Sequence, residues 1–377
     1  MAFVSHASTS KFLSSNFPVT SDITAFTELN PFKGDAGREN KAHHFISVVY
    51  MNGFANERGR VQVYRSEAPH DPHPVKPKAV GFENYYYSQK LSDGTQENHQ
   101  LEDLWNTIET VWPVTVRALE ARQLSPAISL NVLGMMAVMR VRVPAARDVH
   151  AILMEAKLRN EMKDLENAGR LPARFQRYAG QFDAVPVGIN PQRTLPKMSD
   201  DFKLIGDLCF RLGFEVIHNR TKIPFLTSDN PVCSYNPRPA LLRRVPYDHA
   251  GEVELVFPLT SGMLLRGTTK RRPVNMISRH KDVIDPALIR RLNRTIAQFS
   301  YRMTLGKDRS SDDLVQAHSG LVPTISTEVR REPNESTIVW RYIFGARPAL
   351  AQYIDTPEKA ARFERQMSGD GGTDEAR

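Results

Sequence analysis

The chain has 377 residues, 41% of them hydrophobic, and a formal net charge of +8. This length can bury a large core, as one big domain or two interlocked ones, and the composition is ordinary for a soluble globular protein. Two cysteines, Cys209 and Cys233, exclude a disulfide framework or a cysteine-rich zinc site and favour a reducing, cytoplasmic compartment.

The two ends of the chain are expected to differ from its middle. Residues 1–39 are rich in Ser and Thr and lack a signal peptide's basic region and apolar run, which predicts a mobile leader. A single α+β domain is expected over residues 40–345, and a C-terminal extension with a disordered tail over residues 346–377. No run approaches the roughly 20 apolar residues of a membrane span, so no membrane partner is expected.

The first elements of the domain are a strand and a loop. Residues 59–65 alternate apolar and polar side chains, which predicts a strand. Four prolines between Pro69 and Pro77 predict a loop, because proline cannot donate to a strand ladder.

The helical middle, residues 100–169, follows. Apolar residues recur at helical spacing over residues 100–123, with Glu102 and Glu109 along one edge of the apolar stripe. Seven residues separate these carboxylates, so their Cα atoms would lie roughly 10 Å apart along the axis. A second helical block is expected over residues 128–169. Within it Arg142 needs a carboxylate or phosphate partner if it is buried.

Residues 213–280 are strand-rich, and a helix is expected over residues 285–302, with a last strand near Trp340. This order predicts the α+β class, with a central helical block packed on a mainly antiparallel sheet. The expected strands of the strand-rich part are Phe214–His218, Pro224–Ser228, Glu254–Leu259 and Met263–Arg266.

The segment Phe225–Val232 carries the sharpest local signal. An apolar run ends in Thr-Ser-Asp-Asn-Pro, so a buried strand should give way to a stiff turn after Ser228. Asp229 and Asn230 lie in that turn. A carboxylate there suits a catalytic or metal-binding role, and it equally suits a structural turn.

Several short motifs follow one another along the chain. They are His43-His44, Glu83, Glu102, Glu109, Arg142, Phe225–Val232, Pro258–Ser261 and Asn293. Taken in this order, they resemble the bacterial proteins grouped as domain of unknown function 4238. The resemblance covers about residues 41–310, and Phe225–Val232 is its most specific part. This chain has Ser47 where the family has a proline after its His-His motif, and the family implies no settled activity.

Two functions from different classes remain open. In the first, His43 or His44, Glu102 or Glu109, and Asp229 hold a divalent metal ion and form a hydrolase of the phosphodiesterase or nuclease type. In the second, the protein is a non-catalytic binding or sensor module for an acidic ligand. The same residues are then structural, Arg142 pairing with Asp229 or a glutamate.

A basic stretch bears on both hypotheses. Between Arg238 and Arg309 there are 15 Lys and Arg against 6 Asp and Glu. Concentrated positive charge favours nucleic acid or another phosphate-bearing ligand as a partner, and the alternative is a solvated surface of scattered cations.

Overall fold

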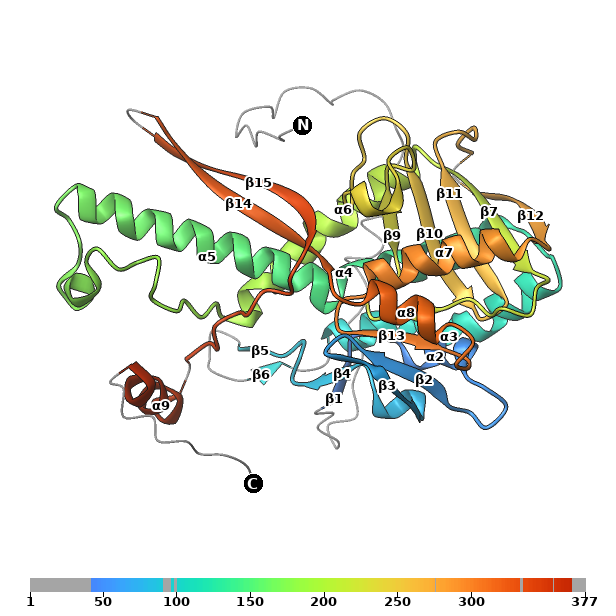
Figure 1. The fold of residues 1–377 in the computed structure, drawn as a ribbon, viewed down its shortest axis with the longest axis horizontal. Coiled ribbons are helices and arrows are strands. Elements are labelled where there is room, and N and C mark those ends of the chain that lie inside the picture. The colour runs from blue at the N-terminus through green and yellow to red at the C-terminus, as the bar shows by residue number, and fades with distance from the viewer. Residues whose placement is uncertain are drawn as a thin grey trace.

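The computed structural model describes residues 42–90, 96–97, 100–274, 276–332, 335–354 and 356–367. The predicted leader and the end of the predicted tail lie outside these residues. Two sheets and several helices form the body of the molecule, and a long helix with a strand hairpin extends from it (Figure 1). The predicted α+β class is confirmed.

The larger sheet has the strand order β12-β7-β11-β10-β9. Its pairs are antiparallel except for β12 with β7, which is parallel. The strands predicted from residue 214 to 218, 254 to 259 and 263 to 266 are confirmed as β7, β10 and β11. The bounds are β7 (Gly213–Asn219), β9 (Cys233–Tyr235), β10 (Glu254–Thr260), β11 (Met263–Thr268) and β12 (Ile277–Val283).

Successive side chains of a strand point to opposite faces, so this sheet contributes to two cores. Leu255 and Phe257 of β10 pack with the helical block, whereas Val256 between them packs with helix α7 (Pro286–Phe299). Figure 1 shows α7 lying across one face of the sheet, with α3 and α4 on the other.

The smaller sheet has the strand order β3-β2-β13-β8. It corrects one prediction, because the proline-rich segment expected to be a loop forms β3 (Ala68–Val75). Proline is tolerated there because β3 is an edge strand, whose outer side needs no donors. The other bounds are β2 (Val61–Arg65), β8 (Thr227–Ser228) and β13 (Met303–Gly306).

The helical block consists of α3 (Gln100–Glu120), α4 (Pro126–Val141) and α5 (Pro144–Asn167). The second block, predicted as one segment, is divided before Pro144, because a proline disfavours helical backbone in the residue before it. Val143 accordingly has extended backbone, with φ −79° and ψ 154°. Among the described residues no single helix is long and apolar enough to cross a membrane, although the bent pair α4 and α5 passes by length and composition together.

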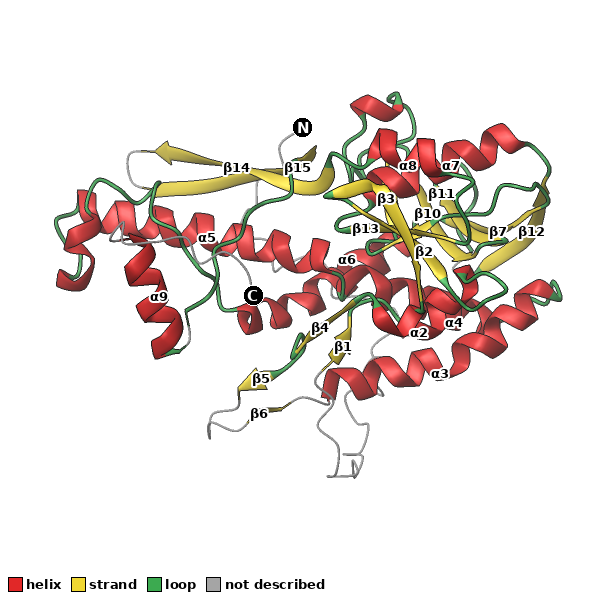
Figure 2. Cartoon of the chain, turned by 60° about the horizontal axis from the view of Figure 1, so that its bottom comes forward, coloured by secondary structure: helices red, strands yellow, loops and turns green. Residues whose placement is uncertain are grey.

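The remaining elements surround this body. Figure 2 shows the hairpin of β14 and β15 running along α5, and the small pair of β1 and β4 beside the helical block. Their bounds are β1 (Ala42–His44), α2 (Val48–Met51), β4 (Phe82–Asn84), β5 (Gln89–Lys90), β6 (Gln96–Glu97), α6 (Met198–Cys209), α8 (Asp312–His318), β14 (Val322–Glu332), β15 (Glu335–Gly345) and α9 (Pro357–Met367).

Candidate functional site

Asp229 lies at the end of β8, as the sequence predicts, and is fully buried. Its Oδ1 accepts a hydrogen bond from the backbone N–H of Tyr301 at 2.8 Å, and its Oδ2 accepts one from Arg302 at 2.7 Å. Burial raises the pKa of Asp229 to about 6, although these N–H donors favour the charged form. The carboxylate therefore joins β8 to the chain that leaves α7.

Two asparagines attach the same segment to α7. The side-chain amide of Asn230 donates to the Phe299 carbonyl at 2.9 Å and to the Tyr247 hydroxyl at 2.8 Å. The side chain of Asn293 on α7 accepts from the N–H of Leu226 at 3.1 Å. It also donates, at 2.9 Å, to the backbone carbonyl of the residue two positions before Leu226. Each amide is thus engaged with groups that would otherwise be buried without partners.

The adjacent histidines lie on β1 with different surroundings. The ring of His43 is fully buried, stacks on Tyr87 at 5.8 Å between centroids, and accepts from the Tyr87 N–H at 3.0 Å. Burial lowers the pKa of His44, which favours the neutral ring, and the charge of Arg142 adds to this effect. Its Nε2 is buried and has no hydrogen-bond partner among the described residues.

Glu109 of α3 forms an ion pair with Arg142, with 2.6 Å between Oε1 and Nη1. Arg142 is 1% exposed, and its Nε also donates to the Phe45 carbonyl at 3.2 Å. Arg142 therefore has the carboxylate partner that its burial requires. Glu102 lies on the same helix, but its side chain is outside the described part of the chain.

The predicted residues therefore form two groups. His44, Glu109 and Arg142 belong to one, and Asp229, Asn230 and Asn293 to the other. Arg302 lies between the groups, because Asp229 holds its backbone and Glu83 pairs with its guanidinium. Glu83 is in turn the cross-strand neighbour of His43 in the β1–β4 pair. No three His, Cys, Asp or Glu side chains within the described ranges are grouped so that they could hold a metal ion.

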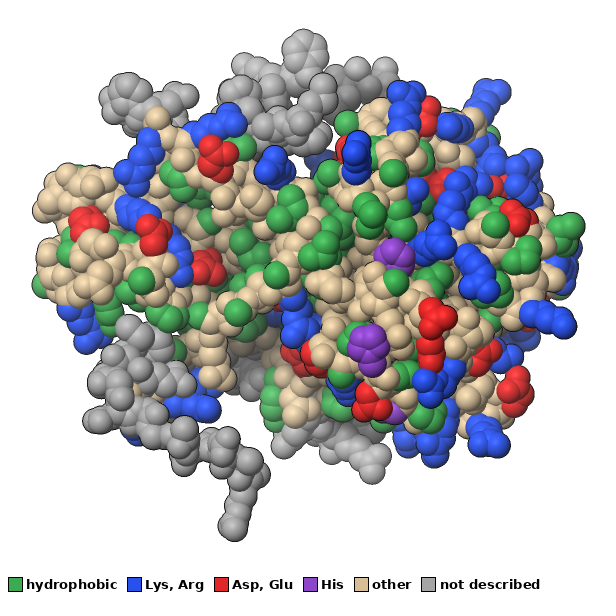
Figure 3. Space-filling model, viewed as in Figure 1, with side chains coloured by type: hydrophobic (Ala, Val, Ile, Leu, Met, Phe, Trp, Pro, Cys, Tyr) green, Lys and Arg blue, Asp and Glu red, His purple; other side chains and the backbone are tan. Residues whose placement is uncertain are grey.

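The basic stretch from Arg238 to Arg309 is spread over both sheets and α7. Figure 3 shows Lys and Arg side chains concentrated over the end of the molecule that carries β7, β11 and β12. Several of them are paired inward, since the fully buried Glu215 attracts three arginines. Those arginines are Arg266 at 3.8 Å, Arg271 at 2.8 Å and Arg279 at 2.9 Å.

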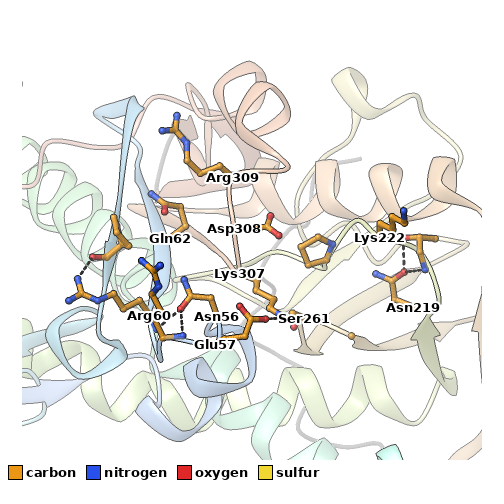
Figure 4. Close-up of a pocket in the computed structure, with 15 residues that line it drawn as sticks. Asn56, Glu57, Arg60, Gln62, Asn219, Lys222, Ser261, Lys307, Asp308 and Arg309 are labelled. Atoms are coloured by element: carbon orange, nitrogen blue, oxygen red, sulfur yellow. Dashed lines mark hydrogen bonds and ion pairs between the residues drawn. The ribbon is translucent and has the colours of Figure 1, made fainter.

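A cleft of about 940 Å³ opens beside the smaller sheet, and we call it the basic cleft (Figure 4). Four segments form it: the turn before β2, the loop after β7, the turn between β10 and β11, and the loop after β13. Five cations and two acids line it. The cations are Arg58, Arg60, Lys222, Lys307 and Arg309, and the acids are Glu57 and Asp308.

Local ion pairs leave part of this charge available. Lys307 pairs with Glu57 at 2.9 Å, and Arg309 pairs with Asp312 of α8 at 2.6 Å. Within the described ranges, Arg58 and Lys222 are exposed and take part in no ion pair. The cleft therefore presents uncompensated positive charge to solvent.

Gln62 of β2 supplies a polar group to the wall of this cleft. The residue is 7% exposed, and its Nε2 has no hydrogen-bond partner in the part of the chain that the structure describes. Figure 4 shows Gln62 and Arg309 on one side of the cleft, with Asn219 and Lys222 on the other. A buried amide without a partner costs free energy, so a ligand oxygen or a water that reached Nε2 from the cleft would be stabilised there.

Sequence reasoning did not single out Arg58, Gln62 or Lys222. The available signal was the exposed Asn-Glu-Arg-Gly turn that precedes β2, where Gly59 has a φ of +66°. Lys222 carried no comparable signal, because only tertiary structure brings its loop beside that turn.

Comparison with known proteins gives a match over the part of the chain that contains these segments. A family model described as protein of unknown function (DUF4238) matches residues 42–310, which include both groups of predicted residues and the basic cleft. No curated protein and no solved structure matches the chain. Because the matched part is well over half of the 377 residues, the chain belongs to the DUF4238 family.

Proposed function

We propose that this protein is a binding module for a phosphate-bearing ligand, which occupies the basic cleft. The observation that supports this proposal is the convergence of five cations and the unpartnered amide of Gln62 on one cleft of about 940 Å³. Cationic side chains and amide donors are the groups that bind phosphate oxygens, and a volume of this size suits a small-molecule ligand.

The family residues support binding over hydrolysis by the way they are engaged. The Asp229 oxygens accept two backbone N–H groups, and Glu109 pairs with Arg142. These contacts already use part of the acceptor capacity of the carboxylates, so fewer lone pairs are left for a metal ion. The metal-dependent hydrolase with His43 or His44 stays a prediction, and we propose structural roles for these residues.

We also propose a cytoplasmic location. Cys209 and Cys233 are both free thiols, and burial raises the pKa of Cys209 to about 12. Free thiols are typical of reducing compartments.

Titration calorimetry with sodium tripolyphosphate tests the binding site. The double variant Arg58→Ala with Lys222→Ala should bind at least about tenfold more weakly, because hydrogen bonds to charged groups contribute about 1.5–3 kcal/mol each. Binding by the unmodified protein should weaken as salt rises, since the contacts are ionic.

The matched control is Arg290→Ala with Arg294→Ala, which removes the same charge from the exposed side of α7 outside the cleft. This control should bind as the unmodified protein does. Equal weakening by both double variants would show that net charge alone attracts the anion. Undetectable binding of tripolyphosphate and of a single-stranded oligonucleotide by the unmodified protein would refute the proposed function.

A further inference from the structure

A second cavity, of about 550 Å³, lies apart from the basic cleft. We call it the Arg302 cavity. Its walls come from the residue after β1, the end of β2 and the turn that follows it, and the segment that leads into β4. The start of α5, the start of β13 and the residues that follow β15 complete them. The last of these segments lies beyond the residues that the family model matches.

Three arginines reach this cavity from separate parts of the chain, namely Arg65, Arg302 and Arg347. Arg65 and Arg347 are exposed, whereas the Arg302 side chain is 30% exposed and fixed from three directions. Asp229 holds its backbone N–H, Glu83 pairs with its Nη1, and its guanidinium carbon lies 5.7 Å from the centroid of the Phe45 ring. Arg302 is therefore positioned before any ligand arrives, which lowers the entropic cost of binding.

Two acids in the walls keep the cavity from being simply basic. Asp148 accepts a hydrogen bond from the Tyr301 hydroxyl at 2.7 Å, and burial raises its pKa. Glu67 lies two residues after Arg65, in the turn that joins β2 to β3.

Apolar side chains distinguish this cavity from the basic cleft. Phe45, Phe82, Met303 and Leu350 line it together with the arginines. The described lining of the basic cleft contains no aromatic ring and no aliphatic side chain other than proline. A ligand that matches the Arg302 cavity must therefore combine an oxyanion with an apolar body, because burial of apolar surface and pairing with arginine are both offered there.

We propose that the Arg302 cavity binds a small organic acid, with its carboxylate between Arg302 and Arg347 and its apolar body against Phe45 and Leu350. Arginine matches a carboxylate through two parallel N–H donors, and only Nη1 of Arg302 is engaged with Glu83. Asp229 and Glu83 act here as positioning residues, which gives these family positions a role in binding without contact with the ligand. This proposal does not depend on the basic cleft.

Titration calorimetry with 1-naphthoate, 1-naphthalenemethanol and acetate tests the two halves of the ligand separately. Naphthoate should bind at least about tenfold more tightly than either the uncharged alcohol or the small acid, since each lacks one of the two interactions. Equal binding of naphthoate and acetate, or of naphthoate and the alcohol, would overturn the proposal. So would the absence of any naphthoate binding at millimolar concentration.

Two variants with opposite expected effects locate the site. Arg347→Ala should weaken naphthoate binding about tenfold by removing one charge-assisted contact, whereas Arg341→Ala, an exposed arginine of β15, should not. Asp148→Asn should tighten naphthoate binding severalfold, because asparagine removes the acidic group from the cavity wall and its amide oxygen can still accept from the Tyr301 hydroxyl. An unchanged affinity in Arg347→Ala, or weaker binding in Asp148→Asn, would contradict the proposed site.

The double variant Arg58→Ala with Lys222→Ala separates the two proposals. It should bind naphthoate normally even where it no longer binds tripolyphosphate. Because Arg347 is exposed, its replacement leaves the core intact, and matching thermal unfolding curves would confirm this. Loss of naphthoate binding in this double variant would show that the organic acid binds in the basic cleft and would contradict the proposed Arg302 cavity site.

Discussion

Replacing Asp229 by alanine should destabilise the protein strongly, because this carboxylate is the acceptor for two backbone donors at the end of α7. The N–H groups of Tyr301 and Arg302 lie 2.8 and 2.7 Å from its two oxygens. Alanine would leave both without this acceptor. A buried polar group left without a partner costs about 1–3 kcal/mol, so Asp229→Ala should lower the free energy of unfolding by about 2–6 kcal/mol. The free energy of unfolding of a typical domain is about 5–15 kcal/mol, so this substitution should remove a large part of it.

Urea denaturation followed by tryptophan fluorescence measures this change. The matched control is Asp285→Ala at the other end of α7, where an exposed aspartate caps the helix by accepting from the N–H of Ala287 at 2.9 Å. Loss of that cap should cost about 0.5–2 kcal/mol. If Asp229→Ala were no more destabilising than Asp285→Ala, the structural role of Asp229 would be refuted. Loss of a bound metal ion at unchanged stability would instead favour the hydrolase.

The remaining predictions concern α7 and the histidine pair on the larger sheet. Asn293→Ala should lower the free energy of unfolding by about 1–3 kcal/mol, because the buried N–H of Leu226 loses its acceptor. The control Arg294→Ala replaces the exposed neighbour and should change this free energy by less than about 0.5 kcal/mol. Equal urea midpoints for the two variants would contradict a structural role for Asn293. Burial lowers the pKa of His218 to about 4, and the neighbouring His280, 2.8 Å away between ring nitrogens, adds to the effect. Since the unfolded value is about 6.5, the folded state binds this proton less tightly, and the stability that it contributes above pH 6.5 is lost as the pH falls towards 4. His218→Asn should remove that part of the pH dependence between pH 7.5 and 4.5, and an unchanged slope in urea midpoint against pH would show that other groups cause it.

The positions of Asp229 and Arg302 connect the family motif to the proposed Arg302 cavity site. The motif fixes the chain between α7 and β13, and Arg302 extends from that chain into its cavity. A structural residue and a proposed binding residue are thus neighbours in one hydrogen-bond network. This arrangement explains why Asp229 can be central to the fold without contacting a ligand.

The sequence by itself determined the α+β class, the strands β2, β7, β8, β10 and β11 of the two sheets, and the abrupt end of β8 at Asp229. These features leave local signals, because apolar periodicity and Asp-Asn-Pro turns depend on residues near one another in the chain. The prediction was wrong at β3, where proline content concealed an edge strand. Edge position is a property of the assembled sheet, so no local pattern could reveal it.

Only the tertiary structure decided what the candidate residues contact. Asp229 meets donors 72 and 73 residues further along the chain, and Arg142 meets Glu109 across two helices. The basic cleft collects Arg58 and Lys222 from loops far apart in the chain, which no periodicity relates. The sequence gives the identity of each side chain, but its contacts depend on how distant segments pack. These contacts decide whether a carboxylate has a structural role or is available to bind a ligand.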